Sequence, residues 1–199
     1  MNLRQLLDSP AARQVRAYGL QHKWYLAGAA GLFTLLLSRG RKPLPYLTTA
    51  QRDEYYGPIR FVAAPTVNNP EAIRITNDFP SRVVWRSMPI IGTIQIHEAA
   101  AESLDAALRE IQRKGWAGKI RSFQGSYVPR FVRGSTKNLS SHSYATSIDV
   151  NADENPQGSG PTEDQKLIAS VFEKHGWYWG DRFSKRDPMH FEYVLKPSV

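Results

Sequence analysis

The chain has 199 residues, of which 41% are hydrophobic and 22% are charged, so its composition is that of a globular protein with room for one domain and an additional segment. It contains no cysteine, which excludes disulfides, cysteine-rich zinc fingers, iron–sulfur clusters and thiol nucleophiles. Any metal must therefore be held by histidine, aspartate or glutamate side chains.

The formal net charge of +8 is concentrated near the N-terminus. Residues 1–42 contain seven basic residues and a single acidic one. A basic segment of this kind favours an anionic membrane surface or an acidic partner. No stretch interleaves aromatic residues with arginine and lysine, so we expect no nucleic-acid partner.

An uncharged apolar run of 14 residues occupies positions 24–37. A full membrane-spanning helix needs about 20 apolar residues. Three interpretations are open: a signal anchor or uncleaved export signal, a helix that docks into a larger assembly such as a virion tail, or a buried helix of the main domain. The first two are favoured because Pro43 and Pro45 separate this run from the rest of the chain.

We therefore predict two parts, an N-terminal arm with its linker at residues 1–45 and a domain at residues 46–199. The arm would contact a membrane or a virion through residues 1–42. An extracytoplasmic location, in the periplasm or cell envelope, follows from the same interpretation.

Helical periodicity is clear in two places. Residues 98–114 have apolar positions at helical spacing, and Gly115 is a natural stop. Residues 163–175 form the second predicted helix, which opens on a capping box of Thr162 and Gln165.

Short runs rich in β-branched and aromatic residues predict strands around these helices. They lie at residues 82–85, 90–96, 119–123, 146–151 and 189–195. Because strands and helices do not alternate regularly, we predict an α+β fold with a mostly antiparallel sheet and flanking helices.

The candidate chemistry lies in the last third of the chain. His142 and Asp149 are too far apart in sequence for one helical face, but a loop entering a strand can bring them together. On the predicted strand, Asp149 lies on the face opposite Ile148 and Val150, which enter the core.

A second acidic residue and histidine follow downstream. Asp187 precedes His190 by three residues, with Pro188 favouring a turn between them. Catalytic zinc takes three protein ligands and one water, and it lowers the pKa of that water to about 7. His142, Asp149 and His190 supply three ligands, and Asp187 could act as the general base and acid.

Each of these residues has an ordinary structural explanation when taken alone. The remaining histidines, His22, His97 and His175, are interpreted in that way, as surface or capping residues. The combination of residue type, spacing and strand context is what favours a zinc site.

The two segments resemble the motifs of the D-alanyl-D-alanine carboxypeptidase family of zinc peptidases, related to lysostaphin-type enzymes and the hedgehog domain. The first family motif, Ser-x-His-x-x-Gly-x-Ala-x-Asp, is matched by Ser140, His142 and Asp149. The second, Asp-Pro-Met-His-Phe-Glu, is matched throughout by residues 187–192. Ala145 and Ser147 stand where the family has glycine and alanine.

The segment at residues 125–134 resembles the part of the family that supplies a substrate-binding arginine. The resemblance therefore implies that Arg130 binds a carboxylate or stabilises the oxyanion, and that Ser140 contacts the substrate or supports the ligands. Ala145 would cost about 1 kcal/mol or somewhat more if its position requires a positive φ.

The predicted function is thus a zinc peptidase that cleaves peptidoglycan stem peptides. The absence of wall-binding repeats, together with the arm, favours a phage-type endopeptidase over a D,D-carboxypeptidase. One alternative is a structural subunit of a phage tail or membrane complex that carries such a domain. Another is a zinc-binding module without turnover, which the presence of Asp187 and Arg130 disfavours.

Overall fold

The computed structural model describes residues 46–195. The predicted N-terminal arm lies outside this part of the chain, so its boundary at residue 45 and its partner stay predictions. Over residues 46–195 the fold is α+β, and every strand pairing is antiparallel, as predicted. No helix in this part of the chain has the length and apolar character needed to cross a bilayer.

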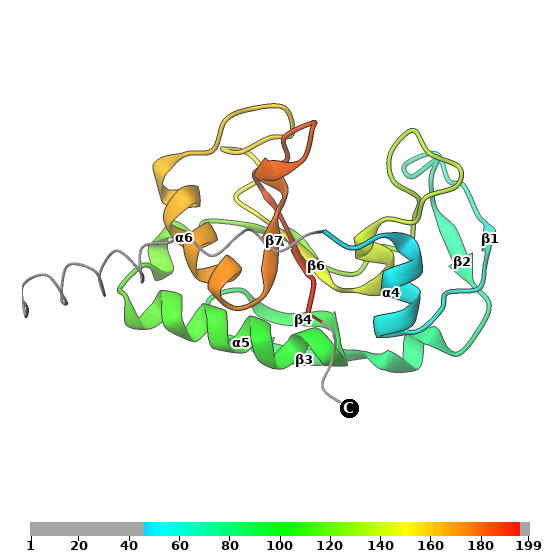
Figure 1. Cartoon of the computed structure of the whole chain (residues 1–199), viewed down its shortest axis with the longest axis horizontal. Helices are drawn as coiled ribbons and strands as arrows, with labels where there is room; N and C mark the ends of the chain where they lie inside the picture. The colour runs from blue at the N-terminus through cyan, green and yellow to red at the C-terminus, as the bar shows by residue number, and fades with distance from the viewer. Residues whose placement is uncertain (1–45, 196–199) are drawn as a thin grey trace, which may run out of the picture. The chain divides into compact units, whose positions relative to one another are not determined.

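Four short strands form the central sheet in the order β5-β6-β8-β7 (Figure 1). They are β5 (Phe123–Gly125), β6 (Ser147–Val150), β8 (His190–Tyr193) and β7 (Trp177–Trp179). Strand β8 lies between two neighbours and is buried along its whole length, so both sets of its alternating side chains have structural roles.

The two predicted helices are present as α5 (Glu98–Arg113) and α6 (Glu163–Lys174). The apolar stripe of α5 is buried at Leu104, Leu108 and Ile111, because helical spacing places these residues on one face. Helix α6 packs against α5 and β7, and its Phe172 ring lies 4.6 Å from that of Phe191 on β8. The central sheet is thus fixed to the helices through its apolar face.

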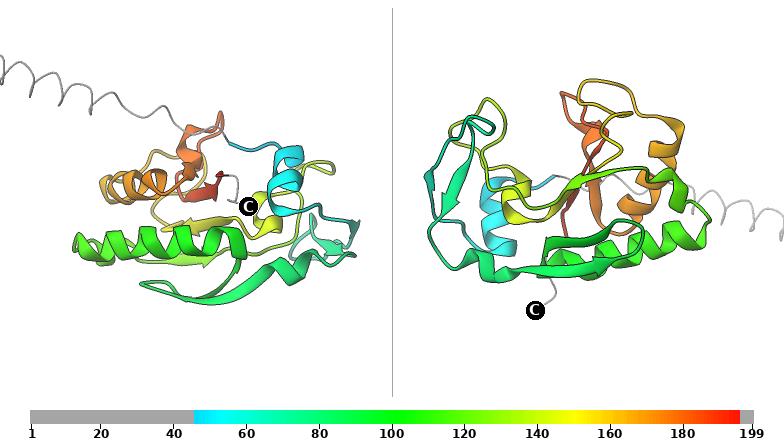
Figure 2. Two further views of the ribbon diagram at one scale, coloured as in Figure 1. Left: turned by 60° about the horizontal axis from the view of Figure 1, so that its bottom comes forward. Right: turned by 180° about the vertical axis from the view of Figure 1, so that it is seen from behind.

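The N-terminal third of the described chain contains a helix and a two-stranded ribbon that the sequence patterns did not resolve, followed by a hairpin whose two strands were predicted at residues 82–85 and 90–96. Helix α4 (Thr49–Tyr56) begins with a complete capping box of Thr48 and Gln51. The two-stranded ribbon of β1 (Phe61–Ala63) and β2 (Ile73–Ile75) follows. The hairpin of β3 (Val83–Met88) and β4 (Gly92–His97) then lies along α5 (Figure 2).

Two local predictions were wrong, and side-chain hydrogen bonds explain both. The strand predicted at residues 119–123 does not form, because the Asn151 side chain accepts the backbone N–H groups of Arg121 and Ser122 before pairing begins at Phe123. The capping box of α6 is only half formed. The Thr162 hydroxyl accepts the N–H of Gln165, but the Gln165 side-chain oxygen accepts from Asn151 Nδ2, and the Thr162 N–H donates to Asn155 Oδ1 instead.

A short 3-10 helix, η3 (Ser141–Tyr144), leads into β6. It ends at Ala145, which has φ 53° and ψ 29° and is fully buried. This left-handed conformation has the positive φ that glycine adopts without strain, and it sets the direction in which the chain enters β6.

Replacing Ala145 by glycine tests the cost of that conformation. Relief of about 1–2 kcal/mol of left-handed strain is offset by about 0.5–1 kcal/mol of extra unfolded-state entropy and by the lost methyl group. We expect Ala145→Gly to leave the free energy of unfolding within about 1 kcal/mol of the parent. The matched change Ala107→Gly, in the buried interior of α5, should cost about 1.5–2 kcal/mol. Urea unfolding measures both, and equal destabilisation would contradict a strained backbone at Ala145.

Candidate metal centre and catalytic cleft

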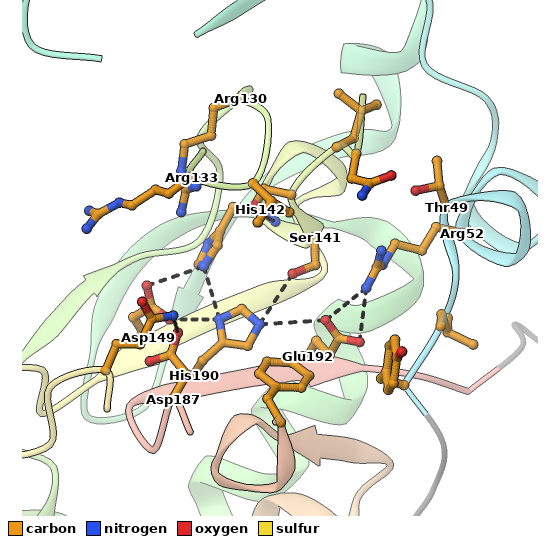
Figure 3. A pocket seen from close by; sticks show the side chains of 18 of the residues that line it. Thr49, Arg52, Arg130, Arg133, Ser141, His142, Asp149, Asp187, His190 and Glu192 are labelled. Carbon is orange, nitrogen blue, oxygen red and sulfur yellow. Dashed lines mark hydrogen bonds and ion pairs between the residues drawn. The ribbon is translucent and has the colours of Figure 1, made fainter. Parts of the chain in front are cut away.

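Three elements bring the predicted metal ligands together (Figure 3). His142 lies in η3, where the Ser140 hydroxyl accepts its backbone N–H. Asp149 on β6 and His190 on β8 are directly paired in the antiparallel register. Paired residues on neighbouring strands direct their side chains to the same face, so the sheet itself sets Asp149 beside His190.

The donor atoms of these side chains are close to tetrahedral spacing. His142 Nε2 lies 3.3 Å from Asp149 Oδ2 and 3.3 Å from His190 Nδ1, and His190 Nδ1 lies 2.9 Å from Asp149 Oδ1. Two ligands at zinc–nitrogen distance and at the tetrahedral angle are about 3.3 Å apart. The three side chains are therefore close enough together to hold a divalent metal.

The hydrogen bonds behind the ligands select the tautomers that such a metal requires. His142 Nδ1 lies 3.2 Å from the Ser126 carbonyl, which can only accept, so Nδ1 carries the proton and Nε2 is free to ligate. His190 Nε2 lies 3.3 Å from the Ser141 hydroxyl and 3.6 Å from Glu192 Oε2. A proton on Nε2 leaves the His190 Nδ1 lone pair facing the other donors.

Glu192 is itself held by a buried cation from the beginning of the described chain. Arg52 on α4 places Nη2 3.0 and 3.1 Å from the two Glu192 carboxylate oxygens. The two side chains are only 11% and 3% exposed, so the pair is shielded from water and requires both partners. Helix α4 is thereby linked through Glu192 to His190.

The charged side chains around His190 strongly shift one another's pKa values. Burial alone would raise the pKa of Asp149, but the His142 and His190 imidazoles hold it well below its usual range. Burial alone would lower the pKa of His190, but its contacts with Asp149 and Glu192 raise it to about 10. The contact between His190 Nδ1 and Asp149 Oδ1 therefore lies at the position that a metal would take.

Asp187 lines the same cleft from the turn that precedes β8. Its Oδ2 atom accepts from Gln157 Nε2 at 3.1 Å, and its Oδ1 atom is buried without a hydrogen-bond partner among the described residues. Burial raises the pKa of this carboxyl, and the charge of Asp149 adds to the effect. An acid with a raised pKa and an unpaired oxygen is suited to accept a proton.

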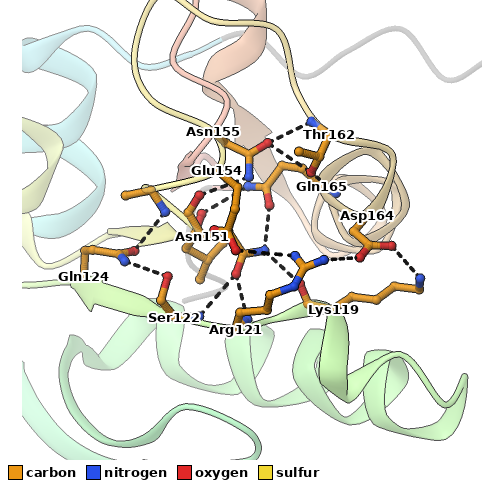
Figure 4. Close-up of polar contacts among 12 residues, drawn as sticks. Lys119, Arg121, Ser122, Gln124, Asn151, Glu154, Asn155, Thr162, Asp164 and Gln165 are labelled. Atoms are coloured by element: carbon orange, nitrogen blue, oxygen red, sulfur yellow. Dashed lines mark hydrogen bonds and ion pairs between the residues drawn. The ribbon is translucent and has the colours of Figure 1, made fainter.

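The turn that carries Asp187 is fixed by hydrogen bonds from two side chains. Trp179 Nε1 and Gln165 Nε2 each donate to the Pro188 carbonyl at 2.8 Å. Gln165 also accepts from Asn151 Nδ2, at the end of β6, so one network joins both metal-bearing strands to α6 (Figure 4). Asn151 is completely buried, so loss of its side chain would leave several backbone groups unpaired.

Arg130 and Ser140 also line the cleft, which has a volume of about 780 Å³. The backbone of Arg130 is held on both sides by the Ser143 hydroxyl, which accepts from its N–H and donates to its carbonyl. Its guanidinium donates to the Phe131 carbonyl through Nη1. The Ser140 hydroxyl already accepts the His142 N–H, so its structural role is to cap η3.

The cleft thus brings together all six residues predicted from the sequence: His142, Asp149, His190, Asp187, Arg130 and Ser140. His97 and His175 lie elsewhere, as expected: His97 caps α5, and His175 ends α6 beside Glu110. His22 lies outside the described residues.

Sequence reasoning missed the supporting residues Arg52, Ser126 and Gln157. Arg52 and Glu192 are 140 positions apart, and no local pattern could join them. Glu192 had one available signal, because strand alternation places it on the same face as His190. Ser126 acts through its backbone carbonyl, which leaves no trace in residue type.

Comparison with known protein families identifies the same part of the chain as the functional one. A family model described as D-alanyl-D-alanine carboxypeptidase matches residues 133–193. The match confirms the resemblance seen in the motifs and supports a hydrolase of the peptidase class. It includes His142, Asp149, Asp187 and His190 but begins after Arg130. Searches of curated proteins and of solved structures found no match.

Gly180 provides a test of the turn that holds Asp187 and His190. A Cβ at this position would lie 2.6 Å from the Asp187 carbonyl oxygen and 3.0 Å from His190 Cβ, so the turn must move. We expect Gly180→Ala to weaken zinc binding at least about 10-fold, as loss of ligand support does. Gly118→Ala is the matched control, since nothing lies within 4 Å of the position that its methyl group would take. Titration of the two variants with zinc measures the difference in affinity. Equal zinc affinities would contradict the conclusion that this turn positions the metal ligand.

Proposed function

We propose that this chain is a zinc-dependent peptidase that cleaves peptidoglycan stem peptides. One observation carries the proposal: three metal-type donor atoms converge at tetrahedral spacing beside Asp187, whose Oδ1 atom is buried and unpaired. The family match over residues 133–193 supports the reaction class.

In this proposal, His142, Asp149 and His190 hold the metal. A zinc ion at this position would supply Lewis acidity toward water and toward the scissile carbonyl. The protein keeps the two imidazoles in the required tautomers through the Ser126 carbonyl and through Ser141 and Glu192.

Asp187 would carry the proton in both halves of the reaction. Its unpaired Oδ1 accepts a proton from the attacking water, and the same carboxyl then donates it to the leaving amine. Gln157 holds the other carboxylate oxygen, which fixes the orientation of the group. The raised pKa of Asp187 makes its carboxylate a stronger base than an ordinary one, so the accepting step is more favourable than it would be for an ordinary carboxylate.

Arg130 would stabilise the oxyanion or bind a substrate carboxylate. Its backbone is fixed by Ser143 and its side chain by the Phe131 carbonyl, so its guanidinium is preorganised. Ser140 would support this arrangement by holding η3, and with it His142, in place.

We favour an endopeptidase over a D,D-carboxypeptidase because the cleft continues on both sides of the metal ligands. Arg130 and Arg133 line it on the His142 side, and Thr49 and Arg52 line it beyond Glu192 (Figure 3). A substrate chain can therefore extend in both directions. The proposed location is the cell envelope or a virion, reached through the N-terminal arm.

Metal removal tests the proposal as a whole. Digestion of muropeptides by the full chain should stop after treatment with EDTA and return when zinc is added. Mass spectrometry of the products should show multi-residue fragments from cleavage inside the stem. Release of a single terminal D-alanine would instead indicate a carboxypeptidase. Undiminished digestion by protein verified to be metal-free would remove the metal from the mechanism.

Asp187→Asn tests the proton carrier without changing the size of the side chain. We expect a decrease in kcat of about 10²–10⁴-fold, the usual contribution of general acid–base catalysis, with zinc binding retained. Asp153→Asn is the control, because Asp153 is exposed and outside the cleft. If Asp187→Asn retained a kcat within a few-fold of the parent, another group would have to carry the proton.

A further inference from the structure

The cations that line the cleft differ in whether they have a carboxylate partner. Arg52 is paired with Glu192. Among the described residues, Arg130, Arg133 and Lys185 line the cleft and form no ion pair. The carboxylate of Asp149 is committed to the two imidazoles. Glu71 accepts the Gly134 N–H in the same turn and, with Asp149 and Asp187, acts on the charge of Arg130, but among the described residues none of these carboxylates forms an ion pair with Arg130 or Arg133. The positive charge of the wall formed by residues 130–133 is therefore only partly offset.

Two of these unpaired cations are neighbours. Arg130 and Arg133 lie on the same side of the ligand group in Figure 3, and Arg133 lies close enough to lower the pKa of Arg130, after the larger effect of burial. Two guanidinium groups at this separation repel each other, and an anion between or beside them relieves the repulsion. A neutral peptide would leave this repulsion in place.

Arg133 is carried by a closed turn and not by an extended loop. Phe131 and Leu139 form a bridge, and the Val132 N–H donates to the Asn138 carbonyl at 2.8 Å. The Ser135 N–H closes the turn on the Val132 carbonyl at 2.9 Å. The backbone of Arg133 is thus held in a defined position, so less ordering is needed when an anion binds.

We propose that Arg133 is a specificity-determining residue that binds a free carboxylate of the substrate, distinct from the group that faces Arg130, so that the preferred substrate is an acidic peptide. This inference rests on the proposed function and names its substrate class. Arg133 would act in binding, since no contact links it to the metal ligands or to Asp187. Its removal should therefore raise KM and leave kcat nearly unchanged.

The experiment pairs Arg133 variants with carboxylate variants of the substrate. The probes are a stem peptide with both its D-glutamate α-carboxylate and its terminal carboxylate free, and two analogues with one or the other as the carboxamide. Arg133→Gln should raise KM for the doubly acidic peptide by about 10-fold or more. For the analogue that lacks the carboxylate bound by Arg133, the same substitution should have little effect. Arg133→Lys should give an intermediate KM, because it keeps the charge but not the paired donors.

Lys137→Gln is the matched control. Lys137 lies in the same turn, is exposed, and does not line the cleft, so its removal changes the net charge equally but should not alter KM. If Arg133→Gln raises KM equally for all three peptides, or no more than Lys137→Gln does, the proposal is wrong.

A binding measurement separates this inference from the proposed function. Calorimetric titration of the zinc-loaded chain with the three peptides requires no turnover. If the chain binds the doubly acidic peptide through Arg133 but cleaves none, the peptidase proposal fails and the carboxylate site stands. If the chain cleaves the peptides equally well with and without Arg133, the peptidase proposal stands and the carboxylate site is wrong. Absence of both binding and cleavage overturns both.

Discussion

The pairing of Asp149 with His190 across β6 and β8 is the constraint on which the rest of the site depends. Because side chains alternate along a strand, a slip of one residue would turn one of the two ligands into the core. The apolar residues between the polar ones prevent that slip: Ile148 and Phe191 are fully buried, and Phe191 packs on Phe172 of α6. The same alternation that builds the core therefore determines the geometry of the metal centre.

The charges around this pair contribute more to geometry than to stability. A buried ion pair such as Arg52–Glu192 is often close to neutral in free energy, because desolvation offsets the attraction. Its value lies in the cost of breaking it, since either partner alone would be a buried uncompensated charge. Arg52 therefore fixes the position of Glu192, and Glu192 orients His190. Helix α4, which precedes the family-matched segment, is in this sense part of the site.

The sequence predicted what local patterns determine and missed what long-range contacts determine. Helices α5 and α6 were found because their apolar periodicity matches their buried faces. Four of the cleft residues were found because spacing, residue type and strand context agree, whereas Arg130 and Ser140 were predicted only through the family resemblance. The strand expected at residues 119–123 failed because Asn151, distant in sequence, takes its backbone donors. Arg52 could not be predicted, since only the tertiary fold brings α4 to β8.

The two neighbouring arginines help to decide between the roles open to Arg130. Oxyanion stabilisation requires a hydrogen-bond donor that is already in place and shielded from water. A hydrated substrate carboxylate, in contrast, can be bound by a guanidinium at a more exposed position. Arg130 is partly buried and tied to the Phe131 carbonyl, and Arg133 is exposed at the turn. If Arg133 holds a substrate carboxylate, Arg130 is free to face the reacting carbonyl. The difference in burial between two residues three positions apart thus favours binding at one and charge stabilisation at the other.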